Sequence, residues 1–348
     1  MKKIELVNIS KKFDNDLILD KINLNVEAGE LVALLGPSGC GKTTTLKLIA
    51  GLLGPDQGDI LFGEKSVLNT KVEKRSSVLV FQDYLLFPHM TVRDNIAFGL
   101  KMRGVSKAKR EAKAESLLEM VDLPGYSHYY PHEISGGQKQ RVSLARALAI
   151  DPEVLLLDEP LSNLDYNLRE DMQNLILELH NKNDMTTIFV THDHEEAMLL
   201  SDKIAIMNKG KVEQYGSGEE IYKKPVNKFV ADFFGTANYI KGRIEKGSFY
   251  FNSTKIPLKN QFNELNKNEI NTAMIRPENI EINSKVKNGI NLKAEIIERK
   301  FIGGKLNYRF KLKNGHELVA STFIEDHNIL NEECNLSVKF ENIWFMAL

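Results

Sequence analysis

Short apolar runs alternate with longer stretches of helical periodicity over the first two thirds of the chain. The apolar runs are rich in Val, Ile and Leu, as is typical of strands buried on both faces. Strands that alternate with helical segments predict a parallel sheet with helices on its faces. The expected buried strands are residues 31–35, 78–81, 154–158, 187–190 and 204–207.

Between the second and third of these strands, the sequence is mostly helical in pattern. Residues 108–121 are rich in Lys, Glu, Ala and Leu, which favour helices. Their charges indicate a helix face that is exposed to solvent. We therefore expect an inserted helical subdomain over about residues 88–149.

The pattern of the sequence changes after Gly235, where helical periodicity fades and Asn becomes frequent. Short alternating segments separated by Gly and Asn turns are typical of a small β-barrel. We predict a first domain over 1–235 and an all-β, OB-like domain over 236–348. The expected strands are 239–244, 249–251, 280–282, 292–297, 306–312 and 316–320, with turns at 246–247, 303–304 and 314–315.

The composition narrows the classes of partner. The 348 residues carry 46 basic and 47 acidic side chains, a net charge of −1. Because no strong positive field exists, we expect no nucleic-acid partner. The two cysteines are too few for a disulfide framework, which fits a reducing compartment. No apolar run approaches the roughly 20 residues that cross a bilayer, and no signal segment is apparent, so we expect the chain in the cytoplasm.

The segment from Gly36 to Thr43 has the spacing of a phosphate-binding loop between a strand and a helix. Its glycines allow backbone N–H groups to surround a phosphate, Lys42 can reach the β- and γ-phosphate oxygens, and Thr43 can ligate Mg²⁺. The helix N-terminus is expected to lower the pKa of Cys40. The expected ATP-binding residues of this loop are Gly36, Pro37, Ser38, Gly39, Cys40, Gly41, Lys42, Thr43 and Thr44.

Two carboxylates, Asp158 and Glu159, end the apolar strand at 154–158. The carboxyl end of a parallel strand lies beside the phosphate-binding loop in such sheets. Asp158 is suited to hold hydrated Mg²⁺, and Glu159 is suited to act as the general base on the attacking water.

A second anion-binding pattern follows within the helical region, at Ile134-Ser135-Gly136-Gly137-Gln138. A Ser hydroxyl and glycine N–H groups at a helix N-terminus form an anion site. With the motifs above, this segment resembles the signature Leu-Ser-Gly-Gly-Gln of the ATP-binding cassette (ABC) family, with Ile134 as a mild departure. The resemblance implies a homodimer in which two copies pack head to tail and each lends Ser135 to the ATP of the other.

Further residues match the ABC pattern in order over 1–235. The resemblance implies that Phe13 stacks on adenine, that Gln82 contacts Mg²⁺ and the attacking water, and that His192 contacts the γ-phosphate. It also implies that residues 162–165, Ser-Asn-Leu-Asp, meet the partner subunit. The catalytic residues implied are Glu159, His192, Gln82 and Lys42, and the metal ligands are Thr43, Gln82 and Asp158.

Residues 81–92 and 130–133 are similar to importer ATPases for polyamines, iron(III) and sulfate. Residues 274–280, Met-Ile-Arg-Pro-Glu-Asn-Ile, are similar to the TOBE domain of those subunits. This resemblance implies a peripheral protein at the cytoplasmic face of the membrane, with transmembrane permease subunits and an external solute-binding protein as partners. The apolar side chains Tyr84, Leu85, Leu86, Phe87 and Met90 are candidates to fill the groove that receives a permease helix.

The transported solute has alternatives. Residues 144–148 differ from the pattern of sugar importers, so we favour iron(III) or a polyamine, with sulfate, phosphonate or another small solute as alternatives. A soluble ABC ATPase that acts in DNA repair or on ribosomes is disfavoured. The repair relatives insert a long coiled coil that is absent here, and the ribosomal relatives usually carry two cassettes where this chain has one. A third hypothesis is that the β domain senses a substrate or a regulator, with transport secondary.

Overall fold

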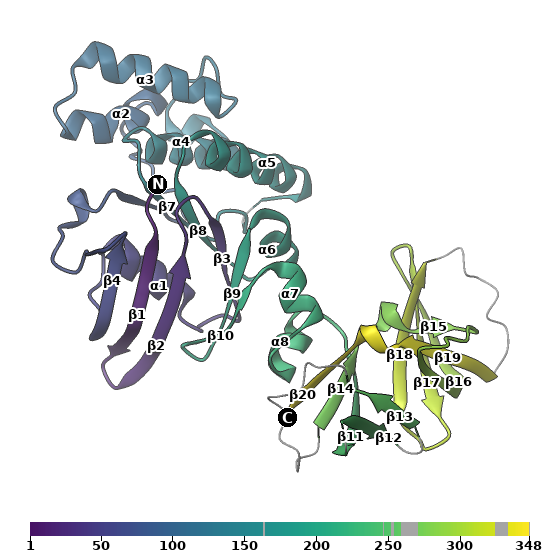
Figure 1. Ribbon diagram of the computed structural model, residues 1–348. Helices are drawn as coiled ribbons and strands as arrows, with labels where there is room; N and C mark the ends of the chain where they lie inside the picture. Colours follow the sequence, from purple (N-terminus) through teal and green to yellow (C-terminus); the bar gives the residue numbers. More distant parts are fainter. Residues whose placement is uncertain (163, 246, 252–253, 259–270, 324–332, 348) are drawn as a thin grey trace. The chain divides into compact units, whose positions relative to one another are not determined.

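The chain forms two compact units in the computed structural model, residues 1–219 and 220–348 (Figure 1). The structure describes residues 1–162, 164–245, 247–251, 254–258, 271–323 and 333–347. Each unit has its own cluster of buried apolar side chains. The boundary between the units lies between Glu219 and Glu220, whereas the boundary expected from the sequence pattern comes later, after Gly235.

A mostly parallel sheet is the centre of the first unit. Its strand order is β10-β9-β3-β8-β7-β6, with β10 antiparallel to β9 at one edge. All five expected strands lie in it, with ends shifted by one residue or less. The strands are β3 (Leu31–Leu35), β6 (Ser77–Val80), β7 (Val154–Asp158), β8 (Thr186–Thr191), β9 (Lys203–Asn208) and β10 (Lys211–Gly216).

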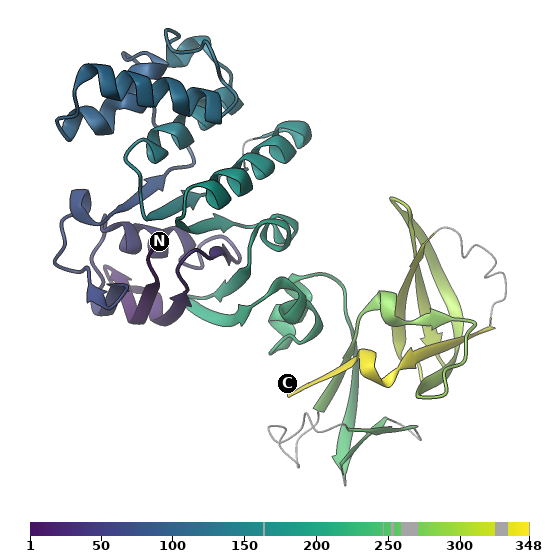
Figure 2. The same cartoon turned by 45° about the horizontal axis from the view of Figure 1, so that its top comes forward.

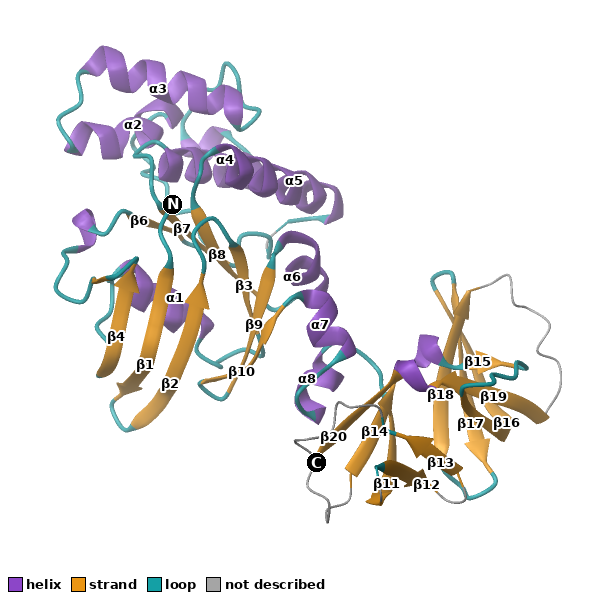
Figure 3. Ribbon diagram, in the orientation of Figure 1, coloured by secondary structure: helices purple, strands orange, loops and turns teal. Residues whose placement is uncertain are grey.

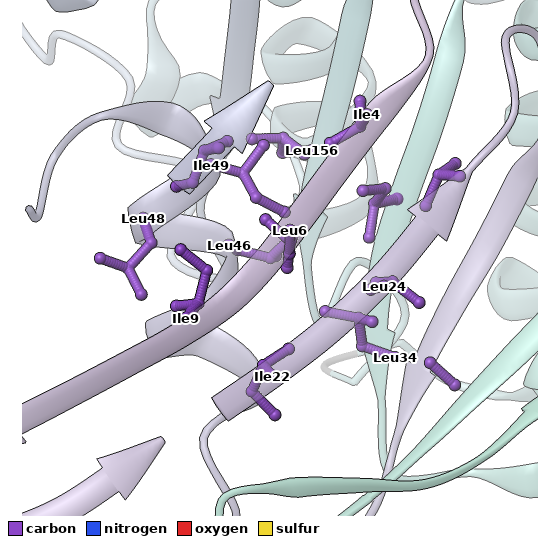
Figure 4. Close-up of a cluster of buried hydrophobic side chains, with 14 of the residues drawn as sticks. Ile4, Leu6, Ile9, Ile22, Leu24, Leu34, Leu46, Leu48, Ile49 and Leu156 are labelled. Carbon is purple, nitrogen blue, oxygen red and sulfur yellow. The ribbon is translucent and has the colours of Figure 1, made fainter. Parts of the chain in front are cut away.

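An antiparallel sheet of order β2-β1-β4-β5 accompanies the mostly parallel one, and this second sheet was not predicted from the sequence. Its strands are β1 (Ile4–Phe13), β2 (Asp16–Val26), β4 (Gln57–Phe62) and β5 (Lys65–Ser66). Helix α1 (Lys42–Ala50) shares one core with both sheets, as Figure 4 shows for Leu6, Leu24, Leu34 and Leu46.

Three helices occupy the range expected for the helical subdomain and lie together at one end of this unit (Figures 1 and 2). They are α2 (Val92–Met102), α3 (Lys107–Met120) and α4 (Gly136–Leu148). Helices α5 (Tyr166–Lys182) and α6 (His194–Leu200) follow β7 and β8, and the short 3-10 turns are η1 (Val72–Lys74) and η2 (Pro131–Glu133). None of the described helices is both long and apolar enough to cross a membrane.

The second unit is mostly β-structure (Figure 3), in sheets of order β13-β12-β11-β14-β20 and β15-β19-β16-β17-β18. Its strands are β11 (Asn238–Glu245), β12 (Ser248–Phe251), β13 (Thr254–Pro257), β14 (Asn271–Ile275), β15 (Glu281–Ile282), β16 (Gly289–Ile302), β17 (Lys305–Leu312), β18 (Glu317–Phe323), β19 (Glu333–Lys339) and β20 (Ile343–Ala347), with 3-10 turns η3 (Pro277–Asn279) and η5 (Phe340–Asn342). The expected turns at 303–304 and 314–315 join β16 to β17 and β17 to β18, whereas Lys246 of the third turn lies outside the described residues.

A buried arginine ties the β-strands of the second unit to its helical residues. Arg276 is 2% exposed and donates to the carbonyl oxygens of Tyr222 at 3.1 Å and Ala231 at 3.0 Å. These carbonyls lie near the C-terminal ends of α7 (Gly218–Lys223) and α8 (Lys228–Phe233), where the helix dipoles favour a cation. The guanidinium also lies 4.1 Å from the centre of the Tyr222 ring. This contact explains why the second unit begins before Gly235.

Arg276→Leu is expected to lower the free energy of unfolding of the second unit by about 2 to 4 kcal/mol, because buried carbonyls lose a charged donor. Urea unfolding followed by the fluorescence of Trp344, the single tryptophan, measures this change. Arg309→Leu removes an exposed ion pair in the same unit and is the control, with an expected loss below about 1 kcal/mol. Equal losses in the two variants would contradict the structural role of Arg276.

Candidate active site

The phosphate-binding loop joins β3 to α1 and depends on glycine at three positions. Gly39 and Gly41 have φ values of 79° and 104°, which other residues rarely adopt. A Cβ on Gly36 would lie 2.2 Å from the carbonyl oxygen of Met207. The backbone can therefore turn tightly here and present its N–H groups to a ligand.

A pocket of about 350 Å³ opens at this loop. That volume is at the lower end of small-molecule sites. It brings together the expected adenine-stacking residue, the loop and the expected general base. The lining residues are Phe13, Ile18, Ser38, Gly39, Gly41, Lys42, Thr43, Thr44 and Glu159, of which Ile18 was not expected.

Lys42 is folded back onto its own loop. Its Nζ atom donates to the carbonyl oxygens of Gly36 at 2.7 Å and Pro37 at 3.0 Å, and the residue is only 7% exposed. Both acceptors are neutral carbonyl groups, so they do not cancel the positive charge that the ammonium group can offer to an anion. Phosphate oxygens that enter the pocket would therefore meet a positive group that is already held in place among its lining residues.

Thr43 and Asp158 join the loop to the end of β7. The hydroxyl of Thr43 donates to Oδ1 of Asp158 at 2.8 Å. Burial raises the pKa of Asp158, and the charge of Glu159 acts in the same direction, while the bond from Thr43 opposes them. A hydroxyl and a carboxylate are hard oxygen donors, so this pair fits Mg²⁺.

Glu159 lies at the centre of a group of polar side chains. Nε2 of Gln82 is 3.4 Å from one carboxylate oxygen of Glu159, and Nδ1 of His192 is 3.8 Å from the other. Gln82 also donates to Oγ of Ser162 at 3.1 Å. The structure thus places Gln82 against the expected base and Ser162, and among the described residues Gln82 makes no hydrogen bond to Thr43 or Asp158. Asn163 of the expected interface loop lies outside them.

Ser135 belongs to a different part of the unit. It is the N-cap of α4, and its hydroxyl accepts from the backbone N–H of Gln138 at 3.3 Å while Oε1 of Gln138 accepts from the N–H of Ser135 at 2.9 Å. Ser135 and Gly136 are exposed, whereas Gly137 is buried. Within the described chain, Ser135, Gly136, Gly137 and Gln138 are not among the residues that line the pocket at the loop.

The helix that Ser135 begins also holds the loop that follows Gln82, a contact that the sequence did not indicate. Arg146 donates to the carbonyl oxygens of Leu85 at 2.9 Å and Tyr84 at 3.0 Å. The hydroxyl of Ser143 donates to the Tyr84 carbonyl at 3.1 Å. Helix α4 is therefore bonded directly to the loop that follows Gln82.

The prediction that the pKa of Cys40 is lowered was wrong. The thiol is 4% exposed and belongs to the core shared by α1 and the two sheets. Burial raises its pKa, and the nearby charge of Lys42 offsets this only in part. Desolvation of the thiolate outweighs the effect of the helix N-terminus here.

This geometry defines a P-loop nucleotide triphosphatase, and the comparisons with known proteins identify its family. A family model described as ABC transporter matches residues 19–162, and one described as TOBE domain matches residues 273–342. A sulfate/thiosulfate import ATP-binding protein of Neisseria meningitidis is 48% identical over 278 residues, covering 79% of this chain and 77% of that protein. The chain belongs to the ABC transporter family.

Relatives named for other solutes are similar to this chain to nearly the same degree. An Fe(3+) ions import ATP-binding protein of Haemophilus influenzae is 45% identical, covering 74% of this chain and 79% of that protein. A spermidine/putrescine import ATP-binding protein of Nitrosomonas europaea is 45% identical, covering 81% of this chain and 79% of that protein.

A solved ATP-binding cassette, described as a dimer in a post-hydrolysis state bound to ADP and phosphate, is 31% identical to this chain. It covers 62% of this chain and 98% of its own length, with a TM-score of 0.57. The predicted α/β ABC ATPase fold with a TOBE domain is confirmed, as is the prediction of an ATP-hydrolysing import subunit.

Cys40 is expected to react with iodoacetamide at least about tenfold more slowly in the folded protein than a free thiol, because burial reduces the fraction of thiolate. Mass spectrometry of the alkylated protein, resolved to Cys40 and Cys334, measures both rates. Alkylation of the urea-unfolded chain is the control. Reaction of native Cys40 at the rate of a free thiol would contradict the burial argument.

Proposed function

We propose that Glu159 activates water for attack on the γ-phosphate of ATP, and that the hydrolysis drives import of a small solute. The observation that carries this proposal is the position of Glu159, which lines the loop pocket and has Gln82 and His192 on either side of its carboxylate. A carboxylate within reach of both water and the γ-phosphate is the arrangement that a general base needs.

The other side chains divide the binding work. Lys42 and the loop N–H groups hold the β- and γ-phosphates, and the exposed ring of Phe13 offers a face to adenine. Thr43 and Asp158 would hold Mg²⁺, which neutralises phosphate charge when it is bound. His192 is 61% exposed at its side chain and free to meet the γ-phosphate.

The site is proposed to be completed by a second copy of the chain. Ser135 and Gly136 are exposed at the N-terminus of α4, where backbone N–H groups and the helix dipole favour an anion. In this family a head-to-tail homodimer brings this terminus to the γ-phosphate of the opposite subunit. The solved relative described as dimeric supports this arrangement.

The permease is proposed to dock in a groove of about 320 Å³ at the edge strand β6, which is lined by residues other than the candidates Tyr84, Leu85, Leu86, Phe87 and Met90. The groove is lined in part by Leu52, Val72, Phe81 and Arg103, and Leu52 and Val72 are about half exposed at 47% and 43%. The charged residues of its lining are Arg103, Glu73 and Asp151, and a groove that combines apolar and charged side chains fits an amphipathic helix from a membrane subunit. The ATPase is accordingly proposed to be a peripheral protein at the cytoplasmic face of the membrane that works with an external solute-binding protein, and its likeness to import ATP-binding proteins supports this proposal.

The solute is proposed to be iron(III) or a polyamine, as the sequence favours. Relatives named for iron(III), spermidine/putrescine and sulfate are 45 to 48% identical to this chain, so sulfate stays an alternative. Solute uptake by the ATPase together with its permease and binding protein decides between them.

Glu159→Gln is expected to retain ATP binding and to lose roughly 10²- to 10⁴-fold in hydrolysis, because an amide cannot accept the proton of water. Phosphate release and nucleotide binding are measured on the same preparation. Glu178→Gln, at an exposed site on α5, is the matched control and should hydrolyse ATP normally. Hydrolysis by Glu159→Gln within about threefold of the parent, far inside that range, would remove Glu159 from this role.

The shared site is tested with mixed dimers that carry Lys42→Ala and Ser135→Arg. With one mutation in each subunit, both lesions fall on the same composite site and the second site is intact. With both mutations in one subunit and a normal partner, each site carries one lesion. We expect the separated arrangement to bind more ATP and to hydrolyse it faster, when one intact site turns over alone.

Differently tagged subunits allow each mixed dimer to be purified, and ATP occupancy is counted beside hydrolysis. Occupancy remains informative where coupling between the sites silences hydrolysis in both arrangements. Equal occupancy and equal hydrolysis in verified dimers would show that Ser135 does not act across the interface.

A further inference from the structure

A buried carboxylate, Glu196, lies in the first helical turns after His192. It is 7% exposed, and its Oε2 atom accepts from the hydroxyl of Thr191 at 2.6 Å. Burial raises the pKa of Glu196, and Asp193 adds to this, while the charges of Arg169 and His192 act against it. A buried carboxylate is costly unless a cation compensates it, so the nearby cation is significant.

That cation is Arg169, in the first turns of α5. Its Nε atom lies 3.7 Å from Oε1 of Glu196, which is an ion pair but longer than a hydrogen bond. The Nε atom is buried and has no hydrogen-bond partner among the described residues. The same guanidinium donates through Nη2 to the carbonyl oxygen of Leu164 at 3.3 Å. Arg169 therefore touches both Glu196 and the loop that the ABC pattern places at the partner subunit.

The bonds of Glu196 also determine how the backbone beside His192 is held. The hydroxyl of Thr191 donates to Glu196 and accepts from the N–H of Asp193 at 3.0 Å. Asp193 in turn caps α6, accepting from the N–H groups of Glu195 at 2.7 Å and Glu196 at 3.3 Å. His192 thus lies between two residues that are fixed through Glu196.

We propose that Arg169 and Glu196 are positioning residues for hydrolysis, which couple the interface loop at Leu164 to the orientation of His192. The proposal rests on the proposed roles of Glu159 and His192. When the loop engages the partner subunit, the first turn of α5 moves and the gap between Nε and Oε1 closes to hydrogen-bond length. This locks the segment from Thr191 to Asp193 and holds His192 against the γ-phosphate.

Neither residue lines the nucleotide pocket, so the coupling should change turnover and leave ATP binding intact. Arg169→Gln and Glu196→Gln are each expected to lower kcat for ATP hydrolysis about tenfold, with KM for ATP within about twofold of the parent. Arg169→Lys keeps the charge but cannot contact Leu164 and Glu196 together, so we expect partial recovery of kcat.

The double variant Arg169→Gln/Glu196→Gln distinguishes coupling from independent damage. Because the two single changes break the same contact between Arg169 and Glu196, kcat of the double variant should also fall about tenfold, not about a hundredfold. It contains no unpaired buried charge, so it keeps the test valid where a single variant folds poorly. Lys182→Gln and Glu178→Gln break an exposed ion pair on the same helix and should leave kcat unchanged.

Three results would overturn the proposal: multiplied losses in the double variant, full kcat in the single variants, or a rise in KM that accounts for the whole loss. These results are distinct from failure of the proposed function. Full hydrolysis by Glu159→Gln would reject the proposed base, whatever the Arg169 variants do. Loss of hydrolysis in Glu159→Gln together with multiplied losses in the double variant would reject the coupling alone.

Discussion

The parallel register of β3, β8 and β7 is the constraint on which the site depends. Leu35 pairs with Thr191, and Asp158 pairs with Val190, so the strands end at the same edge of the sheet. The phosphate-binding loop, Glu159 and His192 each follow directly from one of these ends. The strands are buried on both faces, so a shift in register would exchange the side chains that pack on each face of the sheet and disrupt the core. Packing energy therefore fixes the distances within the site.

The residues away from that edge reach the site through helices. Ser135 begins α4, and Arg146 near the end of α4 holds the carbonyl oxygens that follow Gln82. Helix α4 thus connects its anion-binding N-terminus to the loop that follows Gln82, and Gln82 lies beside Glu159. Arg169 makes a comparable connection from the interface loop to α6. The first connection ends two residues after Gln82, and the second ends on the helix that follows His192. Gln82 and His192 both lie beside Glu159, so the two connections lead toward its surroundings.

The sequence indicated the features that lie close together along the chain and missed those that depend on distant contacts. The glycine loop, the carboxylates at the end of β7 and the five buried strands are continuous patterns. Strands β1 and β2 were not recognised because shifts in their register interrupt the alternation of buried and exposed residues. The contact of Arg276 with Tyr222 spans 54 positions, and the burial of Cys40 depends on packing between two sheets, so neither leaves a local pattern.

Backbone strain supports the assignment of Glu159 independently of any motif. Its φ of 49° is one that non-glycine residues adopt at an energetic cost, directly after a strand whose conformation is regular. The turn directs the carboxylate to the pocket beside Lys42 and away from the continuation of β7. Tyr84 and Leu85, with φ of 59° and 40°, show similar strain in the loop that positions Gln82. Strain of this kind persists where the surrounding contacts impose it, here the buried strand on one side and Arg146 on the other. The strained turns lie at Glu159 and after Gln82, the two residues proposed to act on the attacking water.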